Sequence, residues 1–281
     1  MRTITPSTLQ SYETHLQSEE KSPNTIAKYL RDLRTFSAWL TAHENPDITK
    51  ENVIQYKHHL EQNYKPSSTN SMLVALNRFF RYIGWDDCVV KTIKTQPDHI
   101  YAQEKELTRD DYQKLIDTAK KEGKDRLALV IETIGSTGIR VSELSSFTCE
   151  AVKAGVISIS CKGKYRKIYL VHKLKEKLLL YCKKNNIKKG CIFITRNGNP
   201  LDRTNIWAEM KKLAKKAGVD LKKVFPHNLR HFFACTYYKV HKNISHLADV
   251  LGHSSINTTR IYTATTEETH LKMLESLELV V

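Results

Sequence analysis

The stretch LGHSSINTTRIY occupies residues 251–262 and brings a histidine, an arginine and a tyrosine close together along the chain. Upstream of it stands HNLRH at residues 227–231. Two earlier pieces are also rich in polar and basic side chains, STGIRVSEL at 136–144 and CKGK at 161–164. Arginine, lysine, histidine and tyrosine are side chains that bind phosphate or transfer protons. These four segments are therefore the candidate functional parts of the chain.

The charge of the chain is strongly basic and unevenly distributed. The 281 residues include 45 lysines and arginines against 30 aspartates and glutamates, a formal net charge of +15. Residues 161–223 alone hold 19 basic and 4 acidic side chains, whereas residues 1–95 are nearly balanced. Such a surplus favours polyanionic partners, nucleic acid above all, although a solvated lysine-rich surface gives the same composition.

Cysteine usage and hydropathy indicate the cellular compartment. The six cysteines are scattered and form no C-x-x-C pair, so the spacing of a zinc site is absent and reduced thiols are expected. The first residues contain no apolar signal-peptide core, and no stretch approaches the roughly 18 apolar residues of a membrane helix. We therefore expect a cytoplasmic, nucleoid-associated protein with no membrane partner.

Helical periodicity dominates the first part of the chain. At Ser22 an N-cap and Pro23 precede apolar residues spaced through Leu40, which predicts a strong amphipathic helix. Weaker helical patterns cover 7–16, 49–60 and 67–83. The sequence thus predicts a separate all-α domain over residues 1–86 and a linker over 87–106, where the periodicity fades.

Residues 107–281 mix the two periodicities. A capping box at Thr108 predicts a helix, and further helical spacing follows. The β-branched runs 156–160 and 167–171 flank a short basic connection and predict an antiparallel hairpin. A third short strand is possible over 191–195, and a tail helix is expected over about 268–281. The fold class predicted is mainly α with a small antiparallel sheet.

Taken together and in this order, the four polar segments resemble the tyrosine recombinase and integrase family. The family pattern has an arginine early in the catalytic domain, a hairpin lysine, H-x-x-R, and a glycine–histidine pair followed nine residues later by a tyrosine. The match covers most of the second half of the chain, and the preceding helices resemble the family's SAM-like core-binding domain. The matching positions are Arg140, Lys162, His227, Arg230, His253 and Tyr262.

The resemblance implies that Tyr262 is a nucleophile that cuts DNA as a 3′-phosphotyrosine and leaves a free 5′-hydroxyl. That ester retains the bond energy, so religation needs no ATP, metal or cofactor. A tyrosine with a pKa near 10 needs a base, for which His227 is the candidate. Packing in the fold is the alternative for any one of the 13 tyrosines, and only its position relative to His253 distinguishes Tyr262.

The remaining matched groups have chemistry suited to phosphoryl transfer. Arg140 and Arg230 present planar charged forks that match the oxygens of a phosphorane-like transition state. Lys162 would protonate the leaving 5′-oxygen, with Lys164 as the alternative because the hairpin is shorter than the family's commonest version. His253 would hydrogen-bond a non-bridging oxygen.

Two residues are predicted to support these groups. Glu143, three positions after Arg140, is expected on the same helical face and would orient that arginine. His231 is expected to link its helix to neighbouring elements or to be a buried structural histidine. The spacing of His227 and His231 also suits zinc, but Asn228 stands where H-E-x-x-H has glutamate, so no metal is predicted.

The resemblance further implies partners and architecture. We expect double-stranded DNA with specific recombination sites, a Holliday-junction intermediate, a homotetramer on paired sites with exchanged tail helices, and possible accessory DNA-bending factors. Two domains would close on DNA as a C-shaped clamp. Xer-type resolvases and compact mobile-element integrases have similar two-domain chains, and the mobile-element role is weakly favoured. The alternatives are a type IB topoisomerase and a catalytically inactive DNA-binding regulator.

Overall fold

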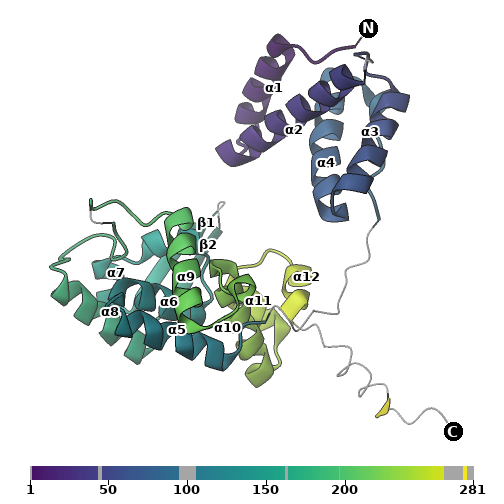
Figure 1. Cartoon of the computed structure of the whole chain (residues 1–281). Coiled ribbons are helices and arrows are strands. Elements are labelled where there is room, and N and C mark those ends of the chain that lie inside the picture. The colour runs from purple at the N-terminus through teal and green to yellow at the C-terminus, as the bar shows by residue number, and fades with distance from the viewer. Residues whose placement is uncertain are drawn as a thin grey trace. The chain divides into compact units, whose positions relative to one another are not determined.

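The computed structural model describes residues 2–43, 46–94, 106–161, 164–195, 197–262 and 275–276 (Figure 1). The chain divides into two compact units, residues 1–97 and residues 98–281. Each unit has its own hydrophobic core. Most of the predicted tail helix and the predicted hairpin lysine Lys162 lie outside the described residues.

The first unit is all-helical, as predicted. It contains α1 (Pro6–Ser18), α2 (Pro23–Ala42), α3 (Lys50–Asn63), α4 (Pro66–Ile83) and a short 3₁₀ helix, η1 (Asp86–Cys88). Side-chain oxygens of Thr5, Ser22 and Thr49 cap the first three helices. Aromatic rings fill much of the core, among them Tyr12, which packs edge-on against Phe79 at 5.2 Å. The capping and spacing signals therefore identified these helices from sequence.

The second unit is mainly helical with one small antiparallel sheet, which confirms the predicted fold class. Its first elements are α5 (Arg109–Lys121), α6 (Asp125–Thr137), η3 (Val141–Ser146), α7 (Cys149–Ala154), β1 (Val156–Cys161) and β2 (Lys164–Tyr169). The later elements are α8 (His172–Lys184), α9 (Arg203–Ala217), η4 (Leu221–Lys223), α10 (Pro226–His241), α11 (Ile244–Leu251), α12 (Ile256–Thr259) and η5 (Arg260–Tyr262).

Helix α6 is central to this unit. Ten of its residues are buried, and it packs against α5, α8 and α10. The sheet pairs β1 with β2 so that Ile157 faces Ile168 and Ile159 faces Arg166. Both isoleucines of β1 are buried, so this face of the hairpin contacts the core.

The predicted third strand over 191–195 is wrong. Cys191 and Ile194 form only isolated bridges, to Thr148 and Pro200, and the sheet among the described residues has two strands. The physical reason is that the backbone bends at Ile192 and Phe193, which are adjacent in sequence yet both buried. A strand would direct two successive side chains to opposite faces.

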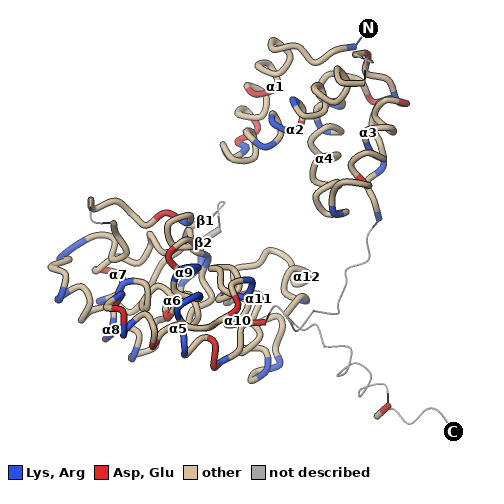
Figure 2. The backbone as a smooth tube through the Cα atoms, in the orientation of Figure 1, with Lys and Arg blue, Asp and Glu red and all other residues tan. Residues whose placement is uncertain are grey.

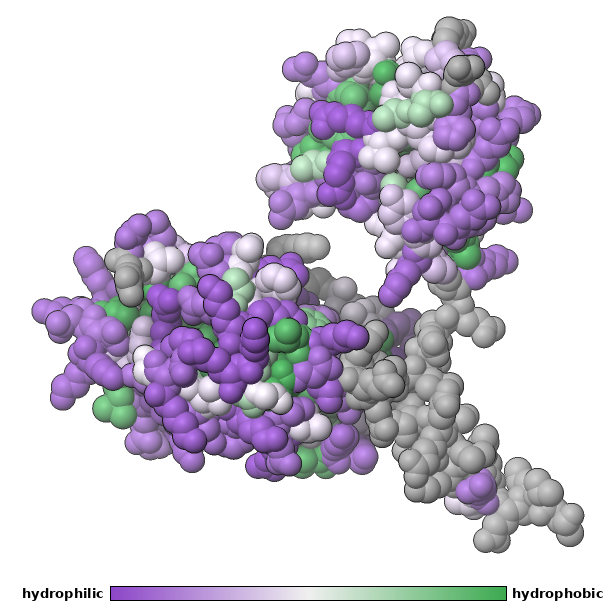
Figure 3. Space-filling model, viewed as in Figure 1, coloured by the Kyte–Doolittle hydropathy of each residue, from purple (hydrophilic) through white to green (hydrophobic). Residues whose placement is uncertain are grey.

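The surface of the chain is predominantly polar. Lysine and arginine positions recur along α8 and α9 (Figure 2), and the face in Figure 3 is hydrophilic with isolated hydrophobic residues. None of the described helices is both long enough and apolar enough to cross a bilayer.

Candidate active site

Arg140 is positioned by the turn that follows α6. The helix ends at Thr137, Gly138 adopts a left-handed conformation with φ of 65°, and Arg140 becomes the N-cap of η3. Its backbone N–H donates to Glu143 Oε2 at 2.7 Å, and its guanidinium Nη1 donates to Glu143 Oε1 at 3.0 Å. The predicted pair is therefore present, but it forms a cap of a 3₁₀ helix rather than sharing one α-helical face.

Glu143 also binds a second arginine, which sequence reasoning missed as a site residue. Arg166 Nη2 donates to Glu143 Oε2 at 2.7 Å, and its Nη1 donates to the carbonyl of Val250 at 2.8 Å. Alternation along β2 could have identified it, because Arg166 shares a strand face with the buried Ile168. Glu143 is 5% exposed, so one buried carboxylate joins two guanidinium groups.

Arg230 is the largest fully buried side chain among the described residues of the unit. Its Nη1 donates to the carbonyl of Gly138 at 2.6 Å, and its Nη2 donates to the carbonyl of Leu251 at 2.8 Å. Burial, reinforced by the charge of Arg140, lowers the pKa of Arg230 to about 10, so the guanidinium remains charged at neutral pH. Helix α10 thereby fixes a cation beside the ends of α6 and α11.

His253 lies directly after the left-handed Gly252 that ends α11. Its Nε2 is 3.0 Å from Arg230 Nη2, and its Nδ1 is 2.8 Å from Thr259 Oγ1. Burial and the neighbouring arginines lower the pKa of His253 to about 4. The imidazole is therefore neutral at pH 7.

Tyr262, at the end of η5, is buried against the same cluster. Its ring packs edge-on against His231 at 5.1 Å and stacks with His253 at 6.1 Å. Burial raises the pKa of Tyr262, and the positive charge of Arg230 opposes that shift. The phenol of Tyr262 is thus held beside a guanidinium that favours its ionised form.

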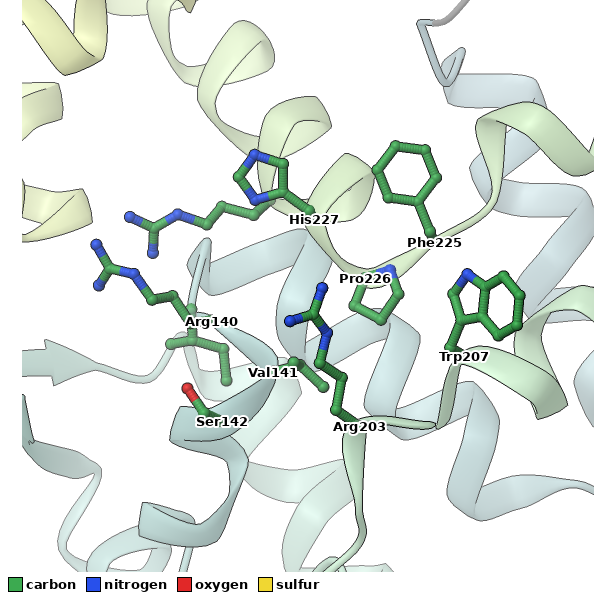
Figure 4. A pocket seen from close by; sticks show the side chains of 10 residues that line it. Arg140, Val141, Ser142, Arg203, Trp207, Phe225, Pro226 and His227 are labelled. Carbon is green, nitrogen blue, oxygen red and sulfur yellow. The ribbon is translucent and has the colours of Figure 1, made fainter. Parts of the chain in front are cut away.

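His227 occupies the first turn of α10 and lines a cavity of about 310 Å³ with both Arg140 and Arg230. Figure 4 shows its imidazole among Arg140, Arg203 and Phe225. Partial desolvation lowers the pKa of His227, and the positive charges of Arg230, Arg140 and Arg203 lower it further. Arg140 also lines a second cavity of about 630 Å³, together with Arg166 and His253.

His231 points to a different environment from His227. It is buried, its Nδ1 is 3.3 Å from Cys235 Sγ, and burial lowers its pKa to about 4. Ligand atoms of Glu106, His231 and Cys235 lie within 4.8 Å of one another, so among the described residues this trio could hold a metal ion. His227, whose spacing from His231 would also suit zinc, is not part of that set.

The chemistry of the described groups is suited to phosphoryl transfer. Arg140 and Arg230 line the same cavity from η3 and α10, His253 contacts Arg230, and the ring of Tyr262 packs against His253. Such cations stabilise the charge that develops on phosphoryl oxygens, and a tyrosine is a competent nucleophile for a covalent phosphoenzyme.

Comparison with known proteins agrees with this class. A model of the phage integrase family matches residues 105–269, and a model of the phage integrase N-terminal SAM-like domain matches residues 9–86. The first match alone covers more than half of the chain. The chain therefore belongs to the phage integrase family, whose relatives here are named tyrosine recombinases.

Two curated relatives illustrate the likeness. Tyrosine recombinase XerA of Thermococcus kodakarensis is 28% identical, over 97% of this chain and 95% of the relative. Tyrosine recombinase XerD of Halalkalibacterium halodurans is also 28% identical, over 90% of this chain and 91% of the relative.

Solved structures share the fold at lower identity. XerH site-specific recombinase, bound to palindromic difH substrate in a post-cleavage complex, gives a TM-score of 0.73 at 20% identity and covers 98% of this chain and 85% of that one. A lambda integrase tetramer bound to a Holliday junction gives a TM-score of 0.72 at 21% identity. The match covers 91% of this chain and 76% of the integrase chain.

Proposed function

We propose that this chain is a site-specific DNA recombinase that cuts and rejoins strands through a 3′-phosphotyrosine at Tyr262. The observation that carries the proposal is the packing of Tyr262 beside Arg230 and His253, with Arg140 reaching the same space from another element. Membership of the phage integrase family supports the same chemistry. The reaction passes through a Holliday junction and uses neither metal nor ATP, because the phosphotyrosine ester conserves the energy of the broken bond.

In this proposal the two arginines bind the non-bridging oxygens of the scissile phosphate. Arg230 is held by two backbone carbonyls and Arg140 by the Glu143 carboxylate, so both guanidinium groups are oriented before the substrate arrives. Preorganised cations need no rearrangement as the charge of the phosphorane develops, and this is why they accelerate the reaction.

Tyr262 is proposed to attack phosphorus while His227 accepts its proton. The lowered pKa of His227 keeps the imidazole neutral at pH 7, as a base requires. The rings in direct contact with Tyr262 are instead those of His231 and His253. A pH–rate profile of strand cleavage for His227→Gln tests the assignment, because loss of the base removes the acidic limb.

Lys162 is proposed as the general acid for the 5′-oxygen, with Lys164 as the alternative. A substrate with sulfur in place of the bridging 5′-oxygen distinguishes them, because a thiolate leaves without a proton from the enzyme. We expect this substrate to restore cleavage to Lys162→Ala and not to an arginine variant such as Arg230→Ala. Rescue of Lys164→Ala alone would transfer the role to Lys164.

The proposed partners are double-stranded DNA with specific sites and a second pair of protomers, giving a homotetramer with tails exchanged between protomers. We further propose residues 1–86 and 107–281 as the two DNA-binding domains of a clamp, joined by a linker over 87–106. Deleting residues 270–281 is expected to impair assembly on paired sites while single-site binding persists. The named Xer relatives support a resolvase-type role over the mobile-element role that the sequence weakly favoured.

Trapping on a nicked suicide substrate tests the proposed function. Wild-type chain in a buffer with chelator should yield a protein–DNA band on a denaturing gel, and Tyr262→Phe should not. Tyr181→Phe is the matched control, because Tyr181 lies on α8 and lines neither cavity beside Arg140. Bands of equal strength for Tyr262→Phe and wild type would refute the proposal.

A further inference from the structure

The cavity beside His227 has a second half that the proposed chemistry does not use. Its walls include the guanidinium of Arg203 and the rings of Trp207 and Phe225, in addition to Arg140 and Arg230 (Figure 4). The lining includes three arginines and a histidine, and none of its residues is acidic. The space is therefore cationic and aromatic at once.

Trp207 is held in place yet remains open to the surface. The Lys211 ammonium lies 5.5 Å from the centroid of the Trp207 ring and 5.8 Å from that of Phe225, so one cation contacts both aromatic rings. Lys211 is itself anchored by a hydrogen bond to the carbonyl of Leu221. Trp207 nevertheless keeps 48% of its surface exposed, so its ring is open to a ligand that enters the cavity.

Arg203 adds a positive charge to the part of the cavity lined by Trp207 and Phe225. It is exposed at the first position of α9, where the helix dipole disfavours a positive charge. The adjacent Asp202 carboxylate instead accepts a hydrogen bond from the backbone N–H of Thr204 at 2.9 Å. Within the described part of the chain no carboxylate lies within 4 Å of the Arg203 guanidinium, so it is available for a phosphate.

We propose that Trp207 and Phe225 form a stacking platform for an unpaired base of the nucleotide next to the scissile phosphate, and that Arg203 binds the following phosphate. The inference rests on the proposed recombinase function. After cleavage the strand with the free 5′-hydroxyl must leave its complement before it can attack another duplex, so bases beside the cut become unpaired. Aromatic rings bind unpaired bases of any sequence, and a neighbouring arginine binds the backbone.

Equilibrium binding to matched duplexes tests this platform. Each duplex carries the recombination site with one unpaired nucleotide beside the cleavage position, and in its twin that nucleotide is abasic. Stacking strengthens binding by about tenfold per base. We therefore expect the chain to bind the duplex with the base about tenfold more tightly than the abasic twin. Trp207→Ala should lose most of this preference, and Trp207→Ala with Phe225→Ala should bind both duplexes equally.

Trp207→Phe is the matched control, since it keeps a ring at this position and should retain most of the preference. An unchanged preference in Trp207→Ala, or no preference in the unmodified chain, would overturn the platform. The readout does not depend on covalent chemistry, so it can be repeated with Tyr262→Phe. Failure of the proposed function would appear separately, as a missing covalent band with intact base preference.

Discussion

Arg230 Nη2 lies 3.0 Å from His253 Nε2, and this contact fixes the protonation of the histidine. A guanidinium only donates hydrogen bonds, so Nε2 must accept and the ring proton sits on Nδ1, which donates to Thr259 Oγ1. The low pKa of His253 agrees with this neutral tautomer. His253 thus orients Arg230 in this arrangement, and donation from Nε2 to a phosphate oxygen requires a proton shift.

This contact predicts different outcomes for two substitutions of His253. His253→Gln can present an amide oxygen to Arg230, whereas His253→Ala leaves that donor without its partner. Hydrogen bonds to charged groups contribute about 1.5–3 kcal/mol, which corresponds to roughly 10- to 150-fold. We expect a loss of cleavage rate in that range for alanine and a smaller loss for glutamine, measured by single-turnover cleavage. Equal losses would show that the acceptor is unimportant.

Alanine substitutions at Gly138 and Gly123 separate the cost of backbone strain from the cost of a steric clash. An added Cβ would lie 2.3 Å from Phe233 Cδ1, whereas at Gly123, which has the same φ of 65°, nothing lies within 4 Å. Both alanine variants incur the left-handed strain of about 1 kcal/mol. We expect Gly138→Ala to lower the free energy of unfolding more than Gly123→Ala does, because only Gly138→Ala adds a steric clash. Gly138→Ala should also lower the cleavage rate, because the Gly138 carbonyl binds Arg230. Equal losses of unfolding free energy for the two variants in urea denaturation would show that Phe233 does not pack closely against Gly138.

The Glu143 carboxylate should matter for stability as well as for activity. Removing one partner of a buried ion pair costs about 3–5 kcal/mol because the remaining charge is left uncompensated. Glu143→Ala takes the carboxylate from Arg166, which is 13% exposed, and from Arg140, which is 39% exposed and screened by water, so we expect a loss near the lower end of this range. Glu176 on α8 is the control because its side chain is 59% exposed, and Glu176→Ala should cost under about 1 kcal/mol. Comparable losses for the two variants in chemical denaturation would show that the network is not stabilising.

Stability should decline on acidification because of buried histidines. The pKa of His231 is about 4 in the folded chain, against an ordinary value of 6.5. The unfolded state therefore binds more protons between these values, so the stabilising contribution is present above pH 6.5 and is lost as the pH falls toward 4. From pH 7 to pH 5 the loss is roughly 1–2 kcal/mol for His231.

Denaturation curves at pH 7, 6 and 5 measure this dependence. His231→Gln should show a shallower decline than the parent chain, whatever its absolute stability. His172 is the control, because its side chain is 85% exposed on α8, and His172→Gln should leave the slope unchanged. An identical slope for all three chains would mean that His231 is not buried in its neutral form.

Local signals in the sequence were sufficient for most of the fold. The Ser22 cap with Pro23 and the Thr108 capping box marked helix starts, because these residues satisfy free backbone N–H groups wherever they occur. The hairpin followed from period-two alternation. The prediction of a strand over 191–195 was wrong because a short apolar run does not reveal a backbone bend that buries two adjacent side chains.

The site was predictable in its residues and less so in its contacts. The pairing of Arg140 with Glu143 follows from a spacing of three, but its 3₁₀ cap geometry depends on how α6 ends at Gly138. The contact of Arg166 with Val250 joins residues 84 positions apart, and such contacts arise only from tertiary packing. The exposure of Trp207 beside Arg203 depends on how α9 packs, and no sequence pattern distinguishes Trp207 from other apolar residues of a helix.

Mass spectrometry of the covalent complex tests most directly whether Tyr262 is the nucleophile. The complex trapped on a suicide substrate is digested with nuclease and trypsin, which should release the peptide spanning residues 261–272. We predict a nucleotide joined through its 3′-phosphate to Tyr262 in that peptide. A nucleotide on another residue, or one joined through a 5′-phosphate, would contradict the proposed mechanism.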